Sequence, residues 1–336
     1  MVVLIGGDSR ERNMSEENKR KLNEQLIRCV LDDKLSNDKK LKKMDYIIKL
    51  GADVNIKNEF GCSVLNIAKF IGDEKIVSFL EEKGAKETGL DREKTEEFFR
   101  TASVEEINKA LRVLPNGYEL DCNVDLSYRK LKELPDFSKV VVRGNFCCID
   151  NLLETLKGAP KEVHGDFNCC GNCLESLEYG PEIVGDVFSC SKNKLKSLKW
   201  APIDVGSCFY CIQNQLETLD GAPEKVNGDF CCSGNKLTSL EGGPKMVEGC
   251  YFCENNCLTT LRGAPVKVGS DFRCHNNQLE NLEGGPIEVG GYYNCSENKL
   301  CSLKGKPIIV DKFFVCDENV NSLGNVLKNI KNWFEM

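Results

Sequence analysis

Hydrophobic and polar positions recur with one fixed period over the C-terminal two thirds of the chain. Proline returns every 21 residues from Pro160 to Pro307. Counted from each proline as position zero, position three is valine, position seven is aromatic, position nine is cysteine and position twelve is asparagine in nine repeats. Positions fourteen and seventeen are leucine in eight of them. A period of this length is typical of a solenoid, in which each repeat stacks on the next.

The spacing within one repeat predicts a short strand followed by a turn. Aromatic and cysteine positions lie two residues apart, so they face the same side of a strand, and their apolar character puts that side inward. Strands stacked about 4.8 Å apart would turn each column of identical residues into a ladder through the core. The asparagine amide can satisfy backbone groups that the turn leaves unpaired. Proline and glycine occur in the segment that connects one strand to the next, and this segment is too short for a helix.

The pattern F-x-C-x-x-N-x-L-x-x-L resembles the leucine-rich repeat, with phenylalanine and cysteine in two leucine places. The segment 126–135 resembles an ordinary leucine-rich repeat and is expected to form a variant first rung. The short period and the proline resemble the bacterial class of these repeats, which occurs in secreted effector proteins, and also repeats in bacterial, phage and giant-virus proteins. The resemblance implies a parallel-β solenoid over residues 119–324. A parallel β-helix is the alternative architecture.

The N-terminal third has a different pattern. Residues 61–68, G-C-S-V-L-N-I-A, resemble the ankyrin signature G-x-T-P-L-H-x-A, with Val64 and Asn66 in place of the usual proline and histidine. Residues 16–50 and 91–114 each have the pattern of a further, degenerate helix pair. Three such units are about the minimum for a stable helical stack. The resemblance implies an ankyrin-like helical repeat domain over residues 16–118.

The two ends of the chain complete the predicted organisation. Residues 1–15 are expected to form a flexible leader. Residues 325–336 carry apolar side chains at helical spacing, and we expect a helix that caps the open end of the solenoid core, since an uncovered strand edge invites association. The predicted fold class is therefore α+β: a helical ankyrin-like solenoid, a parallel-β leucine-rich-repeat-like solenoid and a C-terminal helical cap.

Charge and hydropathy exclude several partners. Lys and Arg number 45 and Asp and Glu number 52, so the net charge is −7. A general nucleic-acid binder needs a basic surface to displace counterions, and this balance argues against one. No stretch approaches 18 apolar residues, so no membrane span is expected. We expect a monomer that binds neither nucleic acid nor membrane.

The twenty cysteines are interpreted from their periodicity. Position nine faces inward, where free cysteine behaves as a small apolar residue, and this favours a reducing compartment. We therefore expect a cytoplasmic protein, or one in a host cytosol if it is a secreted effector. Two of the C-x-x-C pairs place their thiols on opposite faces of a strand, and the third, Cys170 and Cys173, straddles a turn with no second pair nearby, so neither a metal nor another cofactor is expected. Four cysteines at outward positions are expected to react first with thiol reagents: Cys147, Cys208, Cys231 and Cys250.

No catalytic motif emerges from the sequence, and we predict that the protein is not an enzyme. An enzyme whose site is built across repeats is the least favoured alternative, and Asp271, Arg273 and His275 are the only candidates for it. His275 and Glu254 share position ten in adjacent repeats, which predicts that they lie side by side and that the carboxylate favours a charged imidazole.

The outward strand positions suggest a binding surface. These positions should be polar, yet several are aromatic, aliphatic or cationic, and aromatic residues and arginine are enriched at protein interfaces. The predicted partner-binding residues on the concave face are Tyr210, Ile212, Phe252, Arg273, His275, Tyr292 and Phe313. The sequence therefore favours a non-enzymatic protein-interaction module. The alternatives are a secreted effector or a viral or phage factor that binds a host protein, and a structural spacer.

Overall fold

A computed structural model of the protein describes residues 15–32 and 34–317 and divides the chain into two compact units. The first unit comprises the residues up to Asp91 together with Arg112–Pro115, and the second comprises Arg92–Leu111 and the chain from Asn116 onward. The predicted capping helix at 325–336 and all but the last residue of the predicted leader lie outside the described residues.

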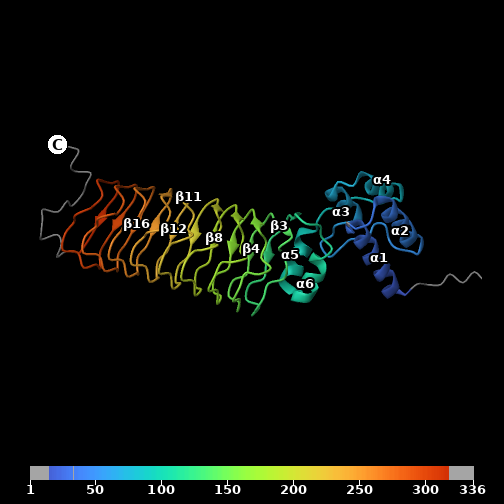
Figure 1. Cartoon of the computed structure of the whole chain (residues 1–336), viewed down its shortest axis with the longest axis horizontal. Coiled ribbons are helices and arrows are strands. Elements are labelled where there is room, and N and C mark those ends of the chain that lie inside the picture. Colours follow the sequence, from blue (N-terminus) through green and yellow to red (C-terminus); the bar gives the residue numbers. More distant parts are fainter. Residues whose placement is uncertain (1–14, 33, 318–336) are drawn as a thin grey trace, which may run out of the picture. The chain divides into compact units, whose positions relative to one another are not determined.

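The first unit contains two pairs of helices (Figure 1). They are α1 (Glu16–Leu31) and α2 (Asn37–Lys49), followed by α3 (Val64–Ile71) and α4 (Glu74–Glu82). The start of α3 shows why the sequence folds this way locally. The Ser63 hydroxyl accepts from the Asn66 N–H, and the Asn66 side chain accepts from the Ser63 N–H at 3.1 Å, which satisfies two donors that a helix start leaves unpaired.

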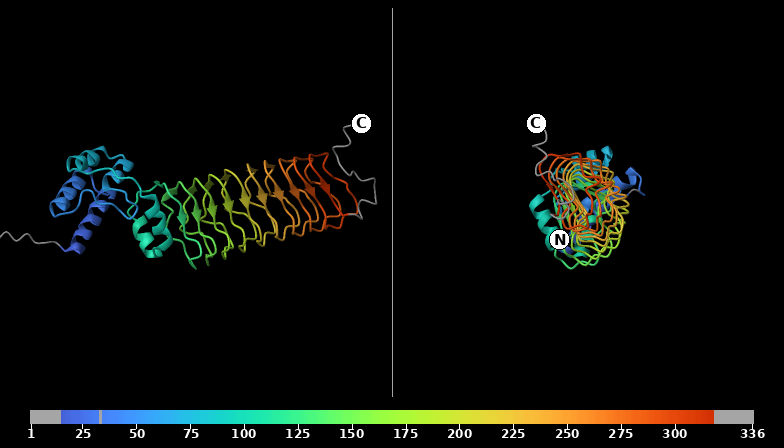
Figure 2. Two further views of the ribbon diagram at one scale, coloured as in Figure 1. Left: turned by 180° about the vertical axis from the view of Figure 1, so that it is seen from behind. Right: turned by 90° about the vertical axis from the view of Figure 1, so that its left-hand side faces the viewer.

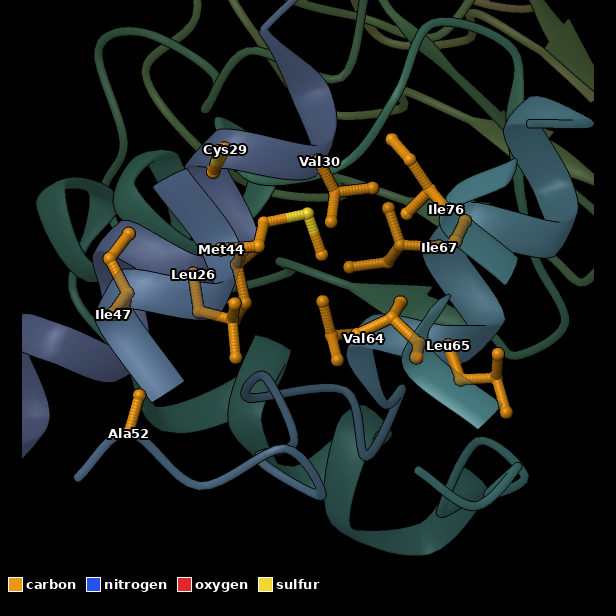
Figure 3. Close-up of a cluster of buried hydrophobic side chains, with 13 residues drawn as sticks. Leu26, Cys29, Val30, Met44, Ile47, Ala52, Val64, Leu65, Ile67 and Ile76 are labelled. Carbon is orange, nitrogen blue, oxygen red and sulfur yellow. The ribbon is translucent and has the colours of Figure 1, made fainter. Parts of the chain in front are cut away.

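The two helix pairs enclose one apolar core (Figure 3). Leu26 and Met44 from the first pair lie with Val64, Ile67 and Ile76 from the second, and all five are fully buried. These residues recur at three- and four-residue intervals within their helices, so each helix turns one apolar stripe inward. The helices predicted at 16–50 and around 61–80 are therefore present, while the relation to ankyrin repeats rests on the sequence resemblance alone.

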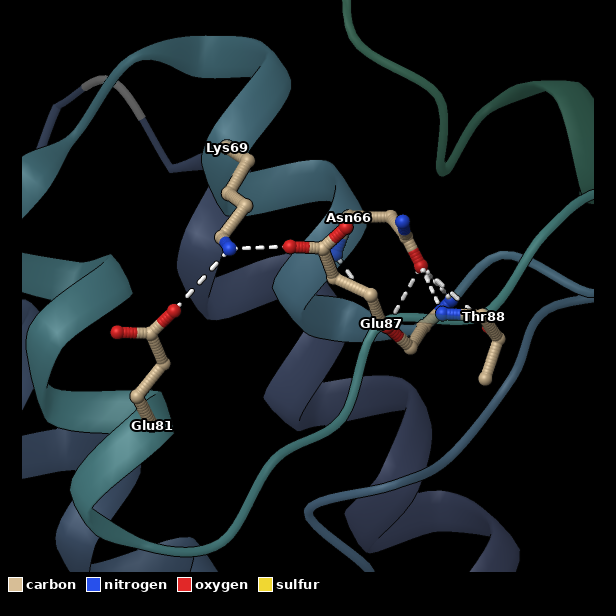
Figure 4. Close-up of polar contacts among 6 residues, drawn as sticks. Asn66, Lys69, Glu81, Glu87 and Thr88 are labelled. Atoms are coloured by element: carbon tan, nitrogen blue, oxygen red, sulfur yellow. Dashed lines mark hydrogen bonds and ion pairs between the residues drawn. The ribbon is translucent and has the colours of Figure 1, made fainter.

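Polar contacts attach the segment after α4 to α3 (Figure 4). The Lys69 ammonium pairs with Glu81 at 3.1 Å and also with Glu87, and hydrogen bonds to these carboxylates raise the pKa of Lys69. The Asn66 side-chain oxygen accepts from the Thr88 N–H at 3.0 Å. The segment is thus held along the helix that begins at the Ser63 cap.

The second unit is a parallel-β solenoid built from stacked rungs, one rung for each 21-residue repeat (Figure 2). One sheet of ten strands contains positions seven and eight of every rung, in chain order. Its strands are β2 (Val124–Asp125), β4 (Phe146–Cys147), β6 (Phe167–Asn168), β8 (Phe188–Ser189), β10 (Phe209–Tyr210), β12 (Phe230–Cys231), β14 (Tyr251–Phe252), β16 (Phe272–Arg273), β18 (Tyr293–Asn294) and β20 (Phe314–Val315).

A second line of strands runs along positions two and three, where the sequence predicted only a return path. Its residues form two five-stranded sheets, with the position-three valines facing the core. The first contains β1 (Tyr118–Leu120), β3 (Val140–Val142), β5 (Glu162–Val163), β7 (Ile183–Val184) and β9 (Asp204–Val205). The second contains β11 (Lys225–Val226), β13 (Met246–Val247), β15 (Lys267–Val268), β17 (Glu288–Val289) and β19 (Ile309–Val310).

Repeated side chains fill the space between the two lines of strands. Position-seven rings stack along the core, with centroids 5.4 Å apart between Phe146 and Phe167 and 5.6 Å apart between Phe209 and Phe230. The Asn235 amide donates to the carbonyls of Cys211 at 3.0 Å and Cys232 at 2.9 Å, and equivalent bonds recur at position twelve of the other described rungs. Each side chain therefore meets the same partner in the next rung.

Two helices belong to this second unit: α5 (Arg92–Thr101) and α6 (Val104–Leu111). The Phe99 ring lies 5.5 Å from Phe137, which in turn lies 5.2 Å from Phe146, so α5 continues the column of rings. Arg129 donates to the Phe99 carbonyl at 2.7 Å and to the Ala102 carbonyl. This division differs from the predicted boundary at residue 118, because the helices over 91–114 pack on the first rungs of the solenoid.

Candidate protein-binding surface

The outer face of the ten-stranded sheet brings outward side chains of successive rungs into rows. The strands pair in parallel without a shift, so Tyr210 lies opposite Cys231, Cys231 opposite Phe252, and Phe252 opposite Arg273. Neighbouring strands in a sheet are about 4.8 Å apart, which puts each of these side chains in reach of the next. The geometry therefore places four position-eight side chains in one continuous row.

Arg273 is held in place by two contacts on this face. Its guanidinium carbon lies 4.6 Å from the centre of the Phe252 ring, within cation–π range, and its Nη2 donates to Asp271 Oδ2 at 3.1 Å. Asp271 is almost buried, whereas the Arg273 side chain keeps 44% of its surface exposed. The cation is thus oriented before any partner arrives and remains accessible.

A second aromatic and cationic group lies at position six of the last two described rungs. The Tyr292 and Phe313 rings stack with their centroids 5.6 Å apart, and Lys312 Nζ lies 5.1 Å from the Tyr292 ring. Both rings are exposed. Together with Phe252 and Arg273 they form the C-terminal part of the surface.

The remaining predicted site residues are less accessible. Tyr210 and Ile212 are half-buried and lie on one rung, and Tyr210 is separated from Phe252 by the rung of Cys231. A hydrogen bond that the Tyr210 phenol makes to Cys208 is the main cause that raises the pKa of Tyr210, with burial as the second cause. These two residues are placed at one end of the row and not in the exposed cluster.

The predicted pairing of His275 with Glu254 is not present. His275 Nδ1 and Glu254 Oε2 are both buried, and within the described residues neither atom has a hydrogen-bond partner. Asp271 pairs with Arg273, and His275 does not join them. The three residues proposed for a catalytic site therefore form one ion pair and one separate imidazole.

One structural feature of this face was not predicted from the sequence. Position-six side chains accept from the backbone of the next rung: Asp229 Oδ1 accepts from the Cys250 N–H at 2.7 Å, and Asp271 Oδ1 accepts from the Tyr292 N–H at 2.9 Å. The recurrence of Asn and Asp at position six was the available signal. Position six is thus partly structural, whereas the side chains of Tyr292 and Phe313 at this position are exposed.

The predicted order of thiol reactivity needs correction. All twenty cysteines are free, and Cys231 is buried, with its thiol 3.2 Å from the Ser233 hydroxyl. Burial raises the pKa of Cys147 to about 11, which also slows its reaction. Cys257 and Cys301 are exposed, so they replace Cys231 and Cys147 as the first expected to react.

The described residues contain no group of three or more His, Cys, Asp or Glu side chains that could hold a metal ion. Within residues 15–32 and 34–317, no helix combines the length and the apolar character needed to cross a bilayer.

No protein-family model matches the chain, and neither does any curated protein. Among solved structures, the chain is similar to YopM, a leucine-rich effector protein from Yersinia pestis, with 17% identity and a TM-score of 0.33. The similarity covers 58% of this chain and 72% of that chain. The solenoid assignment rests on the strand pairing and the repeat period.

Proposed function

We propose that the protein is a non-enzymatic protein-interaction module whose partner binds the outer face of the ten-stranded sheet, on the concave side of the solenoid. The observation that carries the proposal is the accessible cluster of Phe252 and Arg273 beside Asp271. Aromatic rings and oriented arginines are the side chains that contribute most to protein interfaces. A solvent-facing strand does not need them for folding.

The second aromatic group extends this surface toward the C-terminal rungs. Tyr292, Phe313 and Lys312 repeat the combination of ring and cation found at Phe252 and Arg273. Repetition of the same chemistry on one face favours an extended interface over an isolated exposed residue. Tyr210 and Ile212 would form its half-buried N-terminal edge.

The proposal also covers the cellular compartment and the oligomeric state. Twenty free cysteines, with the position-nine thiols in the core, favour a reducing compartment such as the cytoplasm. We propose a monomer there, with the helices around Phe70 and Phe79 as the next surface to test if the sheet face fails. An effector or viral factor that binds a host protein would be a special case of the same function.

Affinity capture from a cell lysate tests the proposal. The test variant is Tyr210→Ala, Phe252→Ala, Arg273→Ala, and the matched control is Glu217→Ala, Arg262→Ala, which also changes exposed side chains. We expect proteins captured by the wild type and by the control to be lost with the test variant, because each central contact contributes about 1–4 kcal/mol of binding. Equal capture by folded test and control variants would remove the sheet face as the site.

A further inference from the structure

A sharp corner of the solenoid, at position nineteen of each rung, requires glycine in most rungs. Six rungs place glycine there with φ between 83° and 97°. A side chain has little room at this corner, because a Cβ on Gly158 would lie 2.7 Å from the Pro135 carbonyl oxygen. Glycine suits both the left-handed backbone and the close approach to the preceding rung. The six residues are Gly158, Gly221, Gly242, Gly263, Gly284 and Gly305.

Two adjacent rungs place large aromatic residues at this same corner. Tyr179 and Trp200 both have φ 69°, in the left-handed region that is unfavourable for bulky side chains. Their side chains do not fill the core, since Tyr179 is 49% and Trp200 67% exposed. The chain therefore holds two exposed rings at a strained corner where glycine would fold more easily. Strain without a gain in packing is a mark of a functional position.

A cleft begins one rung beyond Trp200, where the second line of strands is interrupted between β9 and β11. Within the described residues, the Asn227 N–H makes no bond to the Val205 carbonyl, whereas the equivalent bond from Gly206 to Val184 is 2.9 Å long. The cleft has a volume of about 410 Å³, and Pro202, Ile203, Gly221, Ala222 and Pro223 are among its lining residues. Gly221 occupies the corner next to Trp200, so the rings and the cleft form one surface.

An apolar side chain faces solvent beside this interruption. Ile203, at the edge of the cleft, is 81% exposed. A peptide with a small apolar side chain would fit the cleft at this point.

Unpaired charges around the two rings are mostly negative. Within the described residues, Asp204, Asp220 and Glu178 form no ion pair. At the corner that carries the two rings, Lys199 is the one cation without an ion pair among the described residues. Lys225, which lines the cleft, is already paired with Glu248 at 3.7 Å. A cation over an aromatic ring is favoured by the ring's quadrupole, and the nearby carboxylates add to this attraction.

We infer that this surface, made of Tyr179, Trp200 and the cleft beside Ile203, binds an extended peptide segment that carries an arginine or lysine next to a small apolar residue. The apolar side chain enters the cleft, and the cation lies over the rings near Asp204 and Asp220. The surface belongs to the second line of strands, so it is separate from the site on the ten-stranded sheet.

Trp200 offers a direct reporter, because the chain has only two tryptophans and Trp333→Phe leaves one. The probes are a capped peptide of alternating valine and arginine and its counterpart of valine and glutamate. We expect a saturable change in Trp200 emission with the arginine peptide and binding at least about tenfold weaker with the glutamate peptide. Anisotropy of the labelled arginine peptide provides a second measurement that does not depend on tryptophan.

Three variants decide the assignment. Tyr179→Gly should weaken the arginine peptide about tenfold or more while the unfolding midpoint stays equal or rises, since glycine is the residue of the other rungs. Asp204→Asn, Asp220→Asn should weaken binding and reduce its salt dependence. Phe252→Ala, on the other sheet, should leave the affinity unchanged and so separates this site from the proposed partner surface.

Several results would overturn the inference. They are no saturable binding, equal affinity for both peptides, or unchanged affinity in Tyr179→Gly. A Trp200 signal that depends on protein concentration without any peptide would instead identify a second copy of the chain as the occupant. Loss of binding in Phe252→Ala would move the peptide to the sheet face.

Discussion

The inward and outward faces of the ten-stranded sheet are built from the same two-residue strands but follow different rules. Inward, position seven is a ring in nine consecutive rungs from Phe146 to Phe314, with neighbouring centroids 5.1–5.8 Å apart along the column. Outward, position eight changes from Ser189 to Tyr210, Cys231, Phe252 and Arg273 in consecutive rungs. One face repeats its chemistry and the other does not.

This difference follows from what each side chain contacts. An inward residue packs against its own equivalents in the rungs before and after it, so only a residue that packs well on copies of itself can fill the whole column. An outward residue contacts solvent, and its identity is free of that requirement. Departures from the repeat on the outer face therefore point to contacts outside the fold, while departures on the inner face require a compensating change nearby.

The largest effect expected to distinguish the inward face from the outward face is the loss of solenoid stability at alkaline pH. Burial raises the pKa of each position-nine thiol from Cys148 to Cys295 above the ordinary value of 9.0. The folded state keeps these protons while the unfolded chain releases them, so this stabilisation is complete below about pH 9 and is lost as the pH rises toward the folded pKa. Each thiol should lower the free energy of unfolding by about 1.4 kcal/mol per pH unit in that range.

Denaturant titrations between pH 7.5 and 10.5, under a reducing agent, measure this slope. The control is Cys211→Ala, which removes one fully buried thiol from the column. Its slope should be shallower by the contribution of one thiol. A slope that is the same in the wild type and in this variant would mean that the buried thiols do not govern the alkaline transition.

The next effect compares one ring on each face. Phe230→Ala removes a fully buried ring and should lower the free energy of unfolding by about 3–5 kcal/mol. Phe252→Ala removes a half-buried outer ring and its contact with Arg273, for which we expect a loss below about 1 kcal/mol. Chemical denaturation followed by Trp200 emission, in the Trp333→Phe background, reports on the solenoid alone. Similar losses in the two variants would contradict the distinction between the faces.

The inner face is the part that the sequence predicted well, for a physical reason. A column such as Val142 to Val310 or Cys148 to Cys295 repeats because every rung imposes the same contacts, and repetition is visible without a structure. The helices of the first unit also left a clear signal, since apolar residues such as Leu65 and Ala68 recur at helical spacing and Ser63 provides a cap.

The outer face and the ends of the solenoid could not be predicted in the same way. Whether Cys231 is buried depends on the size of side chains in neighbouring rungs and on Ser233, which alternation within one strand does not reveal. Phe99 continues the column of rings from a helix that lies outside the period, so it carried no repeat signal. The strands at positions two and three were missed because only one of their two residues, the valine, is constant.

A smaller loss of stability is expected from changing the turn at position twelve, which follows each strand of the ten-stranded sheet. Asn235 is buried, its amide donates to the carbonyls of Cys211 and Cys232, and its oxygen accepts from the Asn214 N–H at 3.1 Å. Asn235→Ala leaves these backbone groups without partners and should lower the free energy of unfolding by about 2–3 kcal/mol. The matched control Asn227→Ala removes an exposed amide and should change it by less than about 0.5 kcal/mol.

Urea titrations of the two variants, followed by Trp200 emission, make this comparison. If Asn235→Ala unfolds at the same urea concentration as Asn227→Ala, water replaces the amide at no loss, and the turn would belong with the tolerant outer face.

The smallest predicted effect concerns a departure on the inner face. Most rungs with phenylalanine at position seven have alanine before their proline, as in Ala222, whereas the two rungs with Tyr251 and Tyr293 have Gly243 and Gly285 there. A Cβ on Gly243 would lie 3.1 Å from the Tyr251 hydroxyl oxygen, and also 2.9 Å from Leu219 Cδ1 and 3.0 Å from the Leu240 carbonyl oxygen. The hydroxyl therefore takes the space that an alanine methyl fills in other rungs, which is the compensating change that an inner position requires.

Two single variants and their combination test this compensation. The Tyr251 hydroxyl is buried and has no hydrogen-bond partner within the described residues, so Tyr251→Phe should raise the free energy of unfolding by about 1 kcal/mol. Gly243→Ala should lower it by about 1–2 kcal/mol in the wild type through overpacking. In the Tyr251→Phe background the same alanine should be less destabilising, because one of its close contacts is removed and the pair then matches the rungs of Phe209 and Phe230. A double-mutant cycle measures the coupling, expected at about 1–3 kcal/mol. Additive effects of the two substitutions would show that the glycine and the tyrosine occur together by chance, and that the inner face tolerates departures as freely as the outer one.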